Sequence, residues 1–346
     1  MWERHKQHAP TIALAFGFVW DSLTLGSPDR LFDNAVLLAY ILIAGGSIIL
    51  LNIRLRREKA SLPLLILIQF AFGNLASAMF ILYGKSGTLE GSALFFLILG
   101  VFLVGNEFVK TRYGQMRFHI AAYYFLVFSY LLLVIPTFLG ELGERALIAA
   151  GTVSVLFIAL FMWLISSIIP DAFKGELNKI VFSIATIFIG FNGLYLGNVI
   201  PPVPLAMRHL DMYHAVSRAD GSYIGTYEKA PWYYLWRDSS PQFHRAPGEY
   251  AYCFSSVFAP AKLSAPIYHR WERLNPDTEK WETLSRTSFP IVGGREEGYR
   301  GFSVKTVLPE GKWRCSVETE RGALIGRRSF TVVPHPGGIE LQTTKL

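Results

Sequence analysis

The residues of this chain that could do chemistry form two small groups. The first is Asp21 with Asp29 and Arg30, near the N-terminal end, where Asp21 interrupts an apolar stretch. An ionisable side chain at membrane depth is costly, and it usually marks an ion path, a proton relay or a substrate site. We therefore predict a candidate intramembrane polar site at these three residues.

The second group lies in the C-terminal third of the chain. His269 and Trp271 are two residues apart, so in a strand they project from the same face. Together with Arg300 and Lys305 they could form a small binding surface. In the alternative interpretation, Trp271 is a core residue and His269 is hydrogen-bonded inside the domain.

Familiar catalytic motifs do not occur in the sequence. It contains no nucleophile elbow, phosphate-binding loop, dinucleotide fingerprint or zincin helix. Its apolar segments carry no pair of metal-ligating residues at helical spacing. We therefore expect no catalytic residues, no cofactor and no metal.

The composition predicts a membrane domain that must position the first group. Of the 346 residues 51% are hydrophobic and only 17% are charged, whereas soluble domains have about 25% charged residues. A helix needs roughly 20 apolar residues to cross a bilayer. Six segments meet this length: Phe32–Ile53, Leu62–Tyr83, Leu89–Val109, His119–Leu139, Ala146–Ile169 and Ile180–Ile200.

A seventh segment, Thr11–Leu25, is shorter and contains Asp21. It could be a tight crossing, a re-entrant hairpin or a helix that lies among the others. We thus predict a multi-pass helical bundle of about seven transmembrane helices over residues 1–204, with the lipid bilayer as its partner.

The positive charge does not point to nucleic acid. The formal net charge of +7 divides almost evenly between the two halves of the chain, and neither half has a dense basic stripe. We expect no nucleic-acid partner, and the sequence does not predict an oligomeric state.

The loops between the apolar segments predict the orientation. Counted with the N-terminus, one side carries 11 Lys and Arg residues and the other side 3. Because basic loops stay in the cytoplasm, the N-terminus is predicted to be cytoplasmic. An odd number of crossings then leaves the C-terminal domain outside the cytoplasm.

After the prolines that end at Pro204, the sequence changes character. We expect residues 205–247 to be a juxtamembrane linker and residues 248–346 to be an extracytoplasmic domain. Short runs of aromatic and β-branched residues between turn formers predict antiparallel strands. They are Tyr250–Phe258, Pro266–Leu274, Lys280–Ser285, Tyr299–Thr306, Lys312–Thr319 and Arg327–Val333.

The chain has two cysteines, Cys253 and Cys315, both in predicted strands. A disulfide between them is expected, because the orientation places them in an oxidising compartment. Trp271 lies between them, and this order is typical of the immunoglobulin core. We therefore predict an all-β, immunoglobulin-like antiparallel sandwich, with two buried free thiols as the alternative.

Several stretches of this domain resemble a known family. They are Ile267–Trp271, Tyr299–Thr306, Gly311–Val317 and Phe330–Val332. They are similar to a bacterial domain of unknown function, number 2914, that is often joined to a multi-spanning membrane region. The similarity covers Pro266 to Val333, although the family pattern has Trp-Arg where this chain has Tyr299-Arg300. The resemblance implies a Gram-negative-type envelope protein, which would span the inner membrane and hold its C-terminal domain in the periplasm. It brings no known activity.

Three functional hypotheses follow. The first is a non-enzymatic envelope protein whose β-domain binds a periplasmic protein or a glycan, as a scaffold or a sensor. The second is a transporter or channel with Asp21 in its path. The third is a membrane enzyme at the outer face, using Asp21, Asp29 and Arg30 with His209 or His214.

Overall fold

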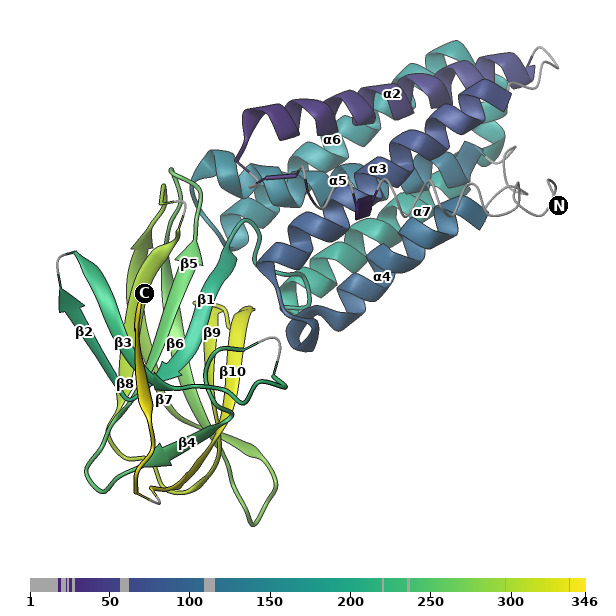
Figure 1. Cartoon of the computed structure of the whole chain (residues 1–346). Helices are drawn as coiled ribbons and strands as arrows, with labels where there is room; N and C mark the ends of the chain where they lie inside the picture. The colour runs from purple at the N-terminus through teal and green to yellow at the C-terminus, as the bar shows by residue number, and fades with distance from the viewer. Residues whose placement is uncertain are drawn as a thin grey trace, which may run out of the picture. The chain divides into compact units, whose positions relative to one another are not determined.

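The computed structural model describes residues 18–19, 23, 25–26, 29–56, 62–108, 116–219, 221–234, 237–295, 297–335 and 337–346. The chain divides into two compact units. One unit is helical and reaches Pro204, and the other is built of strands and begins at Leu205 (Figure 1).

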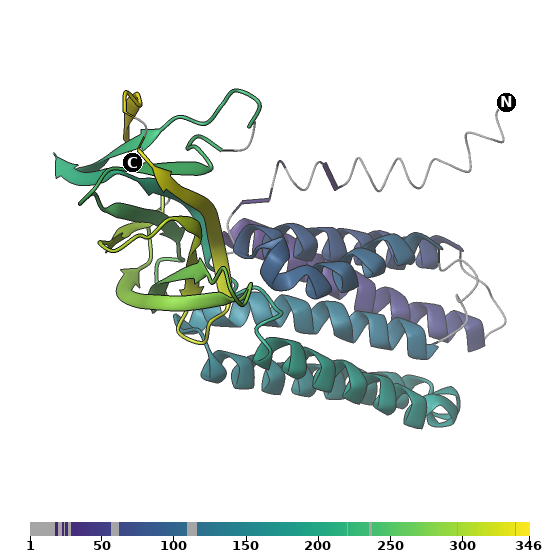
Figure 2. The ribbon, with the colours of Figure 1, turned by 90° about the horizontal axis from the view of Figure 1, so that it is seen from below.

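The described part of the helical unit contains six helices that lie side by side (Figures 1 and 2). They are α2 (Leu31–Arg56), α3 (Leu62–Ser86), α4 (Leu89–Phe108), α5 (Met116–Leu139), α6 (Glu144–Ile168) and α7 (Pro170–Leu196). Five are long and apolar enough to cross a membrane, and α4 is shorter, with an apolar part of Leu89–Gly105. Each of the six predicted apolar segments corresponds to one of these helices.

Helix α5 is the most buried of the five long helices. Its tyrosines bind other helices: the Tyr123 hydroxyl donates to the Ile41 carbonyl at 3.1 Å and the Tyr130 hydroxyl to Asn34 Oδ1 at 3.1 Å. The outer surface is apolar, with Phe182 and Ile189 of α7 74% and 69% exposed. Hydrogen bonds between helices in the interior, together with an apolar outer surface, are compatible with a membrane protein.

The seventh predicted segment cannot be compared with the structure. Asp21 and most of Thr11–Leu25 lie outside the described residues.

The second unit consists of three sheets. The middle sheet has the order β1-β5-β8, the large sheet β4-β10-β9-β6-β7 and the small sheet β11-β3-β2. All strand pairs are antiparallel except the parallel pair of β4 and β10. The strands are β1 (Ala206–Tyr213), β2 (Ala215–Ala219), β3 (Ser222–Glu228), β4 (Gln242–Arg245), β5 (Ala251–Phe258), β6 (Ser264–Leu274), β7 (Trp281–Val292), β8 (Tyr299–Lys305), β9 (Gly311–Thr319), β10 (Leu324–Pro334) and β11 (Leu341–Lys345).

One face of the middle sheet packs against the large sheet. The core between them contains Trp271, Trp313 and Phe330, all at most 3% exposed. The sulfur atoms of Cys253 on β5 and Cys315 on β9 lie 2.09 Å apart in this core, as in a disulfide. The two sheets are thus joined both by apolar packing and by a covalent bond.

The other face of the middle sheet carries the small sheet. The Tyr223 ring of β3 lies 5.5 Å from the Phe254 ring of β5. Gly225 lets β3 approach closely, because a Cβ atom there would lie 2.6 Å from the Tyr213 ring. The middle sheet is therefore covered on both faces.

Two predictions about this unit are wrong. Residues 205–247 are not simply a linker, because they contain β1 to β4, and β1 pairs along its whole length with β5. The strands are also not all antiparallel, since β4 pairs in parallel with β10. By contrast, each of the six strands predicted from Tyr250 onward corresponds to one of β5 to β10.

The bond between the two sheets leads to a first prediction. The cysteines are 62 residues apart. Opening a closed loop of that size stabilises the unfolded chain by about 4 kcal/mol, because the chain regains conformational entropy. Replacing both residues (Cys253→Ala with Cys315→Ala) should lower the free energy of unfolding of the β unit by about that amount. Urea unfolding of the full chain in detergent, followed by near-UV circular dichroism, measures the change.

Wild-type protein that is reduced in denaturant and refolded with reductant should show the same lowered midpoint. An unchanged midpoint in the double variant would contradict the prediction.

Candidate ligand-binding site

The candidate polar residues near α2 do not form a described site. Asp21 is outside the described residues. Arg30 is exposed, and Asp29 is half-buried with an Oδ1 atom that has no hydrogen-bond partner among the described atoms. The side chains nearby bind main-chain groups instead: Asp33 accepts from the Gly26 N–H at 2.9 Å, and Lys85 donates to the Leu25 carbonyl at 2.6 Å.

His269 and Trp271 share one face of β6, as predicted, but they are not on the surface. They are 0% and 1% exposed. His269 Nε2 is bonded to Ser255 Oγ at 2.7 Å and Nδ1 to Ser303 Oγ at 2.9 Å, and Trp271 Nε1 donates to the same Ser303 Oγ at 2.8 Å. Burial lowers the pKa of His269 to about 3, so the ring is neutral.

The four residues therefore do not form the candidate surface. The structure agrees with the alternative interpretation, in which Trp271 is a core residue and His269 is hydrogen-bonded inside the domain. Strand alternation separates the other two members, because Arg300 and Lys305 are five positions apart on β8 and face opposite sides. Lys305 points toward the large sheet and donates to Ser285 Oγ at 3.2 Å. Arg300 lies on the opposite face, where it forms an ion pair with Glu297.

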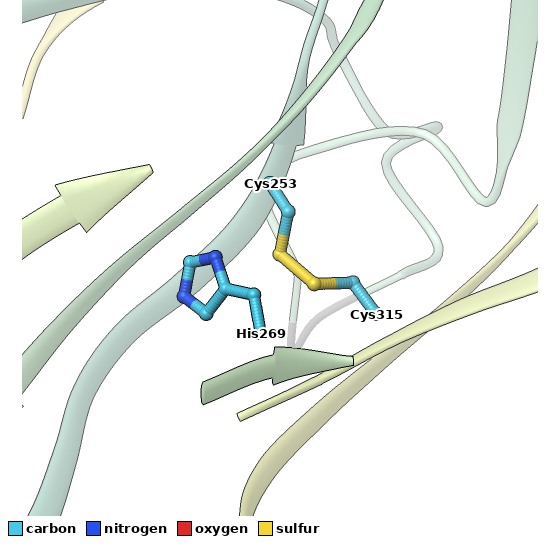
Figure 3. A group of neighbouring side chains, drawn as sticks. All are labelled: Cys253, His269 and Cys315. Carbon is cyan, nitrogen blue, oxygen red and sulfur yellow. A yellow bond between two sulfur atoms is a disulfide. The ribbon is translucent and has the colours of Figure 1, made fainter. Parts of the chain in front are cut away.

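Among the residues that the structure describes, Cys253, His269 and Cys315 bring together donor atoms of the kind that bind a metal ion (Figure 3). The two sulfur atoms are bonded to each other, so neither offers a thiolate, and both ring nitrogens of His269 already have hydroxyl partners. A closed zinc site also requires four ligands. The arrangement is that of a structural core.

A pocket of about 920 Å³ lies between the middle sheet and the small sheet. The middle sheet lines it with Arg208, His209, Asp211, Tyr213, Phe254, Ser256 and Arg300. The small sheet and the adjoining loops contribute Ser222, Tyr227, Asp238, Glu297, Thr344, Lys345 and Leu346. This volume is in the range of small-molecule sites, roughly 300–1,000 Å³.

Alternation along β1 brings His209, Asp211 and Tyr213 to the pocket face. His209 Nε2 is 2.7 Å from the Tyr213 hydroxyl. Burial, reinforced by Arg328, lowers the pKa of His209 although Asp211 opposes the shift. Burial also raises the pKa of Tyr213. Both groups are therefore neutral, and they form a donor and acceptor pair rather than a charged one.

Asp211 has a structural environment. It is 1% exposed, and its carboxylate accepts hydrogen bonds from the Met212 N–H, from Ser239 Oγ and from Arg328 Nη2 at 2.9 Å. Three donors satisfy a buried carboxylate, so Asp211 holds β1 to its surroundings and is not a free acid or base.

The charges around the pocket balance. Three basic side chains (Arg208, Arg300 and Lys345) and three carboxylates (Asp211, Asp238 and Glu297) line it. Aromatic rings form part of the wall: the Tyr213 ring lies 6.0 Å from Tyr227 and 6.1 Å from Phe254. Of these three rings Tyr227 is the partly exposed one, whereas Tyr213 and Phe254 are 2% and 1% exposed. The site can thus offer many hydrogen-bond donors and acceptors, together with the Tyr227 ring, without a strong net charge.

A second polar cluster, the polar hub, consists of His214, Glu228, His244 and Glu249. His214 Nε2 is 2.8 Å from Glu228 Oε1, and its Nδ1 is 2.6 Å from Glu249 Oε1. His244 Nδ1 is 2.6 Å from Glu228 Oε2. The hub joins the end of β1, the end of β3, strand β4 and the segment before β5, so it connects all three sheets.

The hub requires a charged His214. Ionised carboxylates only accept hydrogen bonds, so both ring nitrogens of His214 must donate, which makes it an imidazolium. Burial disfavours this form, but the hydrogen bonds with Glu228 and Glu249 outweigh it and raise the pKa of His214 above its ordinary 6.5. Burial likewise opposes ionised Glu228, yet its bonds with His214 and His244 lower its pKa below its ordinary 4.5.

Sequence reasoning missed most of the pocket. It singled out His209 and Arg300, but Arg208 and Tyr227 lie in the segment that was predicted to be a linker, and Lys345 lies after the last predicted strand. One signal was present: polar or aromatic residues at every second position, His209, Asp211 and Tyr213, are typical of a strand with one polar face.

The polar hub leads to a second prediction. Because folding raises the pKa of His214, its stabilisation is complete below pH 6.5 and is lost as the pH rises through the raised pKa. Because folding lowers the pKa of Glu228, its stabilisation is present above pH 4.5 and is lost as the pH falls through the lowered pKa. The stability of the β unit should therefore be highest between pH 4.5 and pH 6.5, where both contributions are present.

Thermal midpoints of the full chain, followed by near-UV circular dichroism from below the lowered pKa of Glu228 to above the raised pKa of His214, measure the effect. The His214→Gln variant should lack the fall on the alkaline side, while His335→Gln, at an exposed position outside the hub, should keep it. Identical pH profiles for wild type and His214→Gln would refute the assignment.

Known proteins offer few similarities. No functionally curated protein matches the chain. Among solved structures, an alkylpurine DNA glycosylase from Pseudomonas fluorescens has 9% identity and a TM-score of 0.24, over 78% of this chain and 80% of its own.

Two β-glucosidases are also similar to part of the chain. The enzyme from Listeria innocua has 10% identity and a TM-score of 0.20, over 33% of this chain and 16% of its own. The enzyme from Kluyveromyces marxianus has 9% identity and a TM-score of 0.17, over 40% and 15%. This chain thus spans less than a fifth of either glucosidase, and TM-scores this low do not indicate a shared fold.

The match to a protein family is specific to one region. Residues 264–332 match the model described as "Protein of unknown function (DUF2914)". They include β6 to β9 and most of β10, and therefore Trp271 and Cys315 of the core. The C-terminal region of this chain contains a DUF2914 domain.

Proposed function

We propose that this chain is a multi-pass inner-membrane protein that holds a non-enzymatic, ligand-binding β unit on the periplasmic side. The observation that carries the proposal is the charge-balanced pocket between the middle and small sheets, with the Tyr227 ring in its lining. Its ligand is a hydroxyl-rich glycan.

The basic residues support the orientation. Helices α2 to α7, if they alternate across the membrane, bring Arg54, Lys110 and Lys174 with their basic neighbours to one side. Arg30, Lys85 and Arg145 come to the other side. The basic side is cytoplasmic, so the chain after α7 emerges on the opposite side. A crossing by the segment before α2 would complete seven spans.

The β unit suits an oxidising compartment. A cysteine pair at bonding distance joins two facing sheets, and Trp271 of β6 is the register partner of Cys315 on β9. A tryptophan beside an inter-sheet disulfide is a hallmark of immunoglobulin-like sandwiches. We therefore assign the middle and large sheets to this class.

The pocket favours a glycan over other small ligands. Sugars have many hydroxyl groups that donate and accept, and apolar faces that pack on aromatic rings. The neutral His209–Tyr213 pair, the balanced charges and the partly exposed Tyr227 ring match these properties. A strongly anionic ligand would gain little from a lining with equal numbers of acids and bases.

The pocket does not favour catalysis. A general acid or base needs a titratable group that is free to reach the substrate, whereas Asp211 is saturated by three donors and Glu297 is ion-paired with Arg300. The alternative of an enzyme at the outer face would use His209 or His214. His214 is fixed between two carboxylates, and His209 Nε2 is bonded to the Tyr213 hydroxyl. The transporter alternative rests on Asp21, outside the described residues.

The orientation gives a third prediction. Alkaline phosphatase fused after Leu346 should be active in intact cells, because this enzyme folds only in an oxidising compartment. Green fluorescent protein at the same position should be dark. If the phosphatase fusion is inactive and the green fluorescent protein fusion is fluorescent, the β unit lies in the cytoplasm and the proposal is contradicted.

The pocket gives a fourth prediction. Isothermal titration of the full chain in detergent with neutral disaccharides and with muropeptides should detect binding of at least one. Removing a pocket hydrogen-bonding cation (Arg208→Gln) or a pocket ring (Tyr227→Ala) should weaken that binding about tenfold, the usual effect of one strong contact.

Tyr250→Ala serves as the matched control, because Tyr250 is an exposed ring (46%) that does not line the pocket. Its affinity should equal that of the wild type. Absence of binding to every sugar tested, or equal affinities for Tyr227→Ala and Tyr250→Ala, would reject the glycan site.

A further inference from the structure

The outer face of the large sheet, away from the core, is unusually rich in arginine. Alternation along β6 and β9 sends Trp271 and Cys315 into the core and their neighbours outward. We call this outer surface the arginine face, and it consists of Tyr268, Arg270, Glu272, Trp281, Arg286, Lys312, Arg314, Ser316, Glu318 and Arg327.

The strand register places three arginines in one row. Arg270 of β6 is paired with Arg286 of β7 on one side and with Ser316 of β9 on the other, and Ser316 is paired with Arg327 of β10. Like charges on directly opposed positions destabilise a sheet. The repulsion between these arginines therefore destabilises the sheet unless negative charges lie close to them.

Two buried glutamates supply these negative charges. Glu318, 2% exposed, lies 3.0 Å from Arg270 and 2.8 Å from Arg286. Glu272, also 2% exposed, accepts two hydrogen bonds from Arg314 at 2.7 and 2.8 Å. Arg270, Arg286 and Arg314 are thus attached at their inner sides to carboxylates, and Arg327 donates to the Ser316 hydroxyl at 2.9 Å.

Aromatic rings orient two of the guanidinium groups further. The guanidinium carbon of Arg286 lies 3.8 Å from the centre of the Tyr268 ring, and that of Arg314 lies 4.2 Å from the centre of the Trp281 ring. Side chains that are already ordered lose little rotamer entropy when a partner binds. The face is therefore preorganised.

The two glutamates do not neutralise the face. Four arginines and Lys312 outnumber Glu272 and Glu318 by three charges. This excess of fixed positive charge on a surface calls for an anionic partner.

The form of the face distinguishes among anionic partners. Small ligands prefer concave sites, but this is a sheet face. The guanidinium groups lie close to the sheet: the side chains of Arg270, Arg286 and Arg314 are 28%, 36% and 16% exposed. They therefore do not extend into a lipid headgroup layer, as flexible basic side chains do. Arginine, tyrosine and tryptophan, with little lysine, are the composition of protein–protein contact sites.

We propose that the arginine face binds an acidic surface of a second protein. This inference does not rest on the glycan pocket, which lies on the other side of the middle sheet. Carboxylates of the partner would accept hydrogen bonds from N–H groups on the outer sides of the guanidinium groups. At Arg286 these come from Nη1, because Nη2 already donates to the carbonyls of Thr319 and Glu320.

The test uses the full chain in nanodiscs of zwitterionic lipid and a fluorescein-labelled peptide of alternating Glu and Thr. Fluorescence anisotropy should report binding that weakens as salt is added, and the matching Gln–Thr peptide should not bind. Arg327→Gln should lower the affinity at least about fivefold, as expected for one contact residue.

Two further variants separate a preorganised face from general attraction. Arg286→Gln with Glu318→Gln leaves the net charge unchanged and removes an ion pair, and it should also weaken binding. Arg218→Gln removes one positive charge from β2 in the small sheet, outside the arginine face, and it should bind as the wild type does.

Several results would overturn the proposal. They are no binding of the acidic peptide, an equal loss in Arg218→Gln and Arg327→Gln, or full affinity in the charge-neutral double variant. Tighter binding of heparin, or displacement of the peptide by anionic lipid vesicles, would assign the face to a polysaccharide or a bilayer instead. The disaccharide titration is unaffected by these variants, so failure here leaves the pocket proposal intact.

Discussion

The β unit depends on the alternation of side chains along one strand, β5. Cys253 and Ser255 point into the core, where they bond to Cys315 and His269. Phe254 and Ser256, between and after them, point into the pocket. Because successive residues of a strand face opposite sides, a single register serves both the packing of two sheets and the lining of a binding site.

The polar groups of the interior are consistent with this arrangement. Buried polar atoms must find partners, and Ser255, Ser303, His269 and Trp271 satisfy one another inside the core. The polar hub does the same at the margin of the sheets, where His214 neutralises part of the charge of two glutamates. Both clusters are specific in geometry, so they select one relative position of the sheets in a way that apolar packing alone does not.

The sequence predicted the local features well and the assembled site poorly. Apolar runs identified α2 to α7, and the strands with two-residue periodicity, such as Lys312–Thr319 for β9, were predicted almost to the residue. Alternation also showed that His269 and Trp271 share a face, but periodicity cannot tell which face is inside. Strand β1 was missed because its pocket-facing residues are polar, and the pocket joins Arg208 to Lys345, which only tertiary structure brings together.

The two-faced middle sheet also affects how such a protein can evolve. Substitutions at an exposed lining residue such as Arg208 alter the site, while the cross-linked interior on the opposite face of the middle sheet is left unchanged. Recognition and the stability of the core are therefore separable traits in this unit. Relatives could diversify in what they bind while keeping one scaffold, whereas an insertion of a single residue in β5 would damage both properties at once.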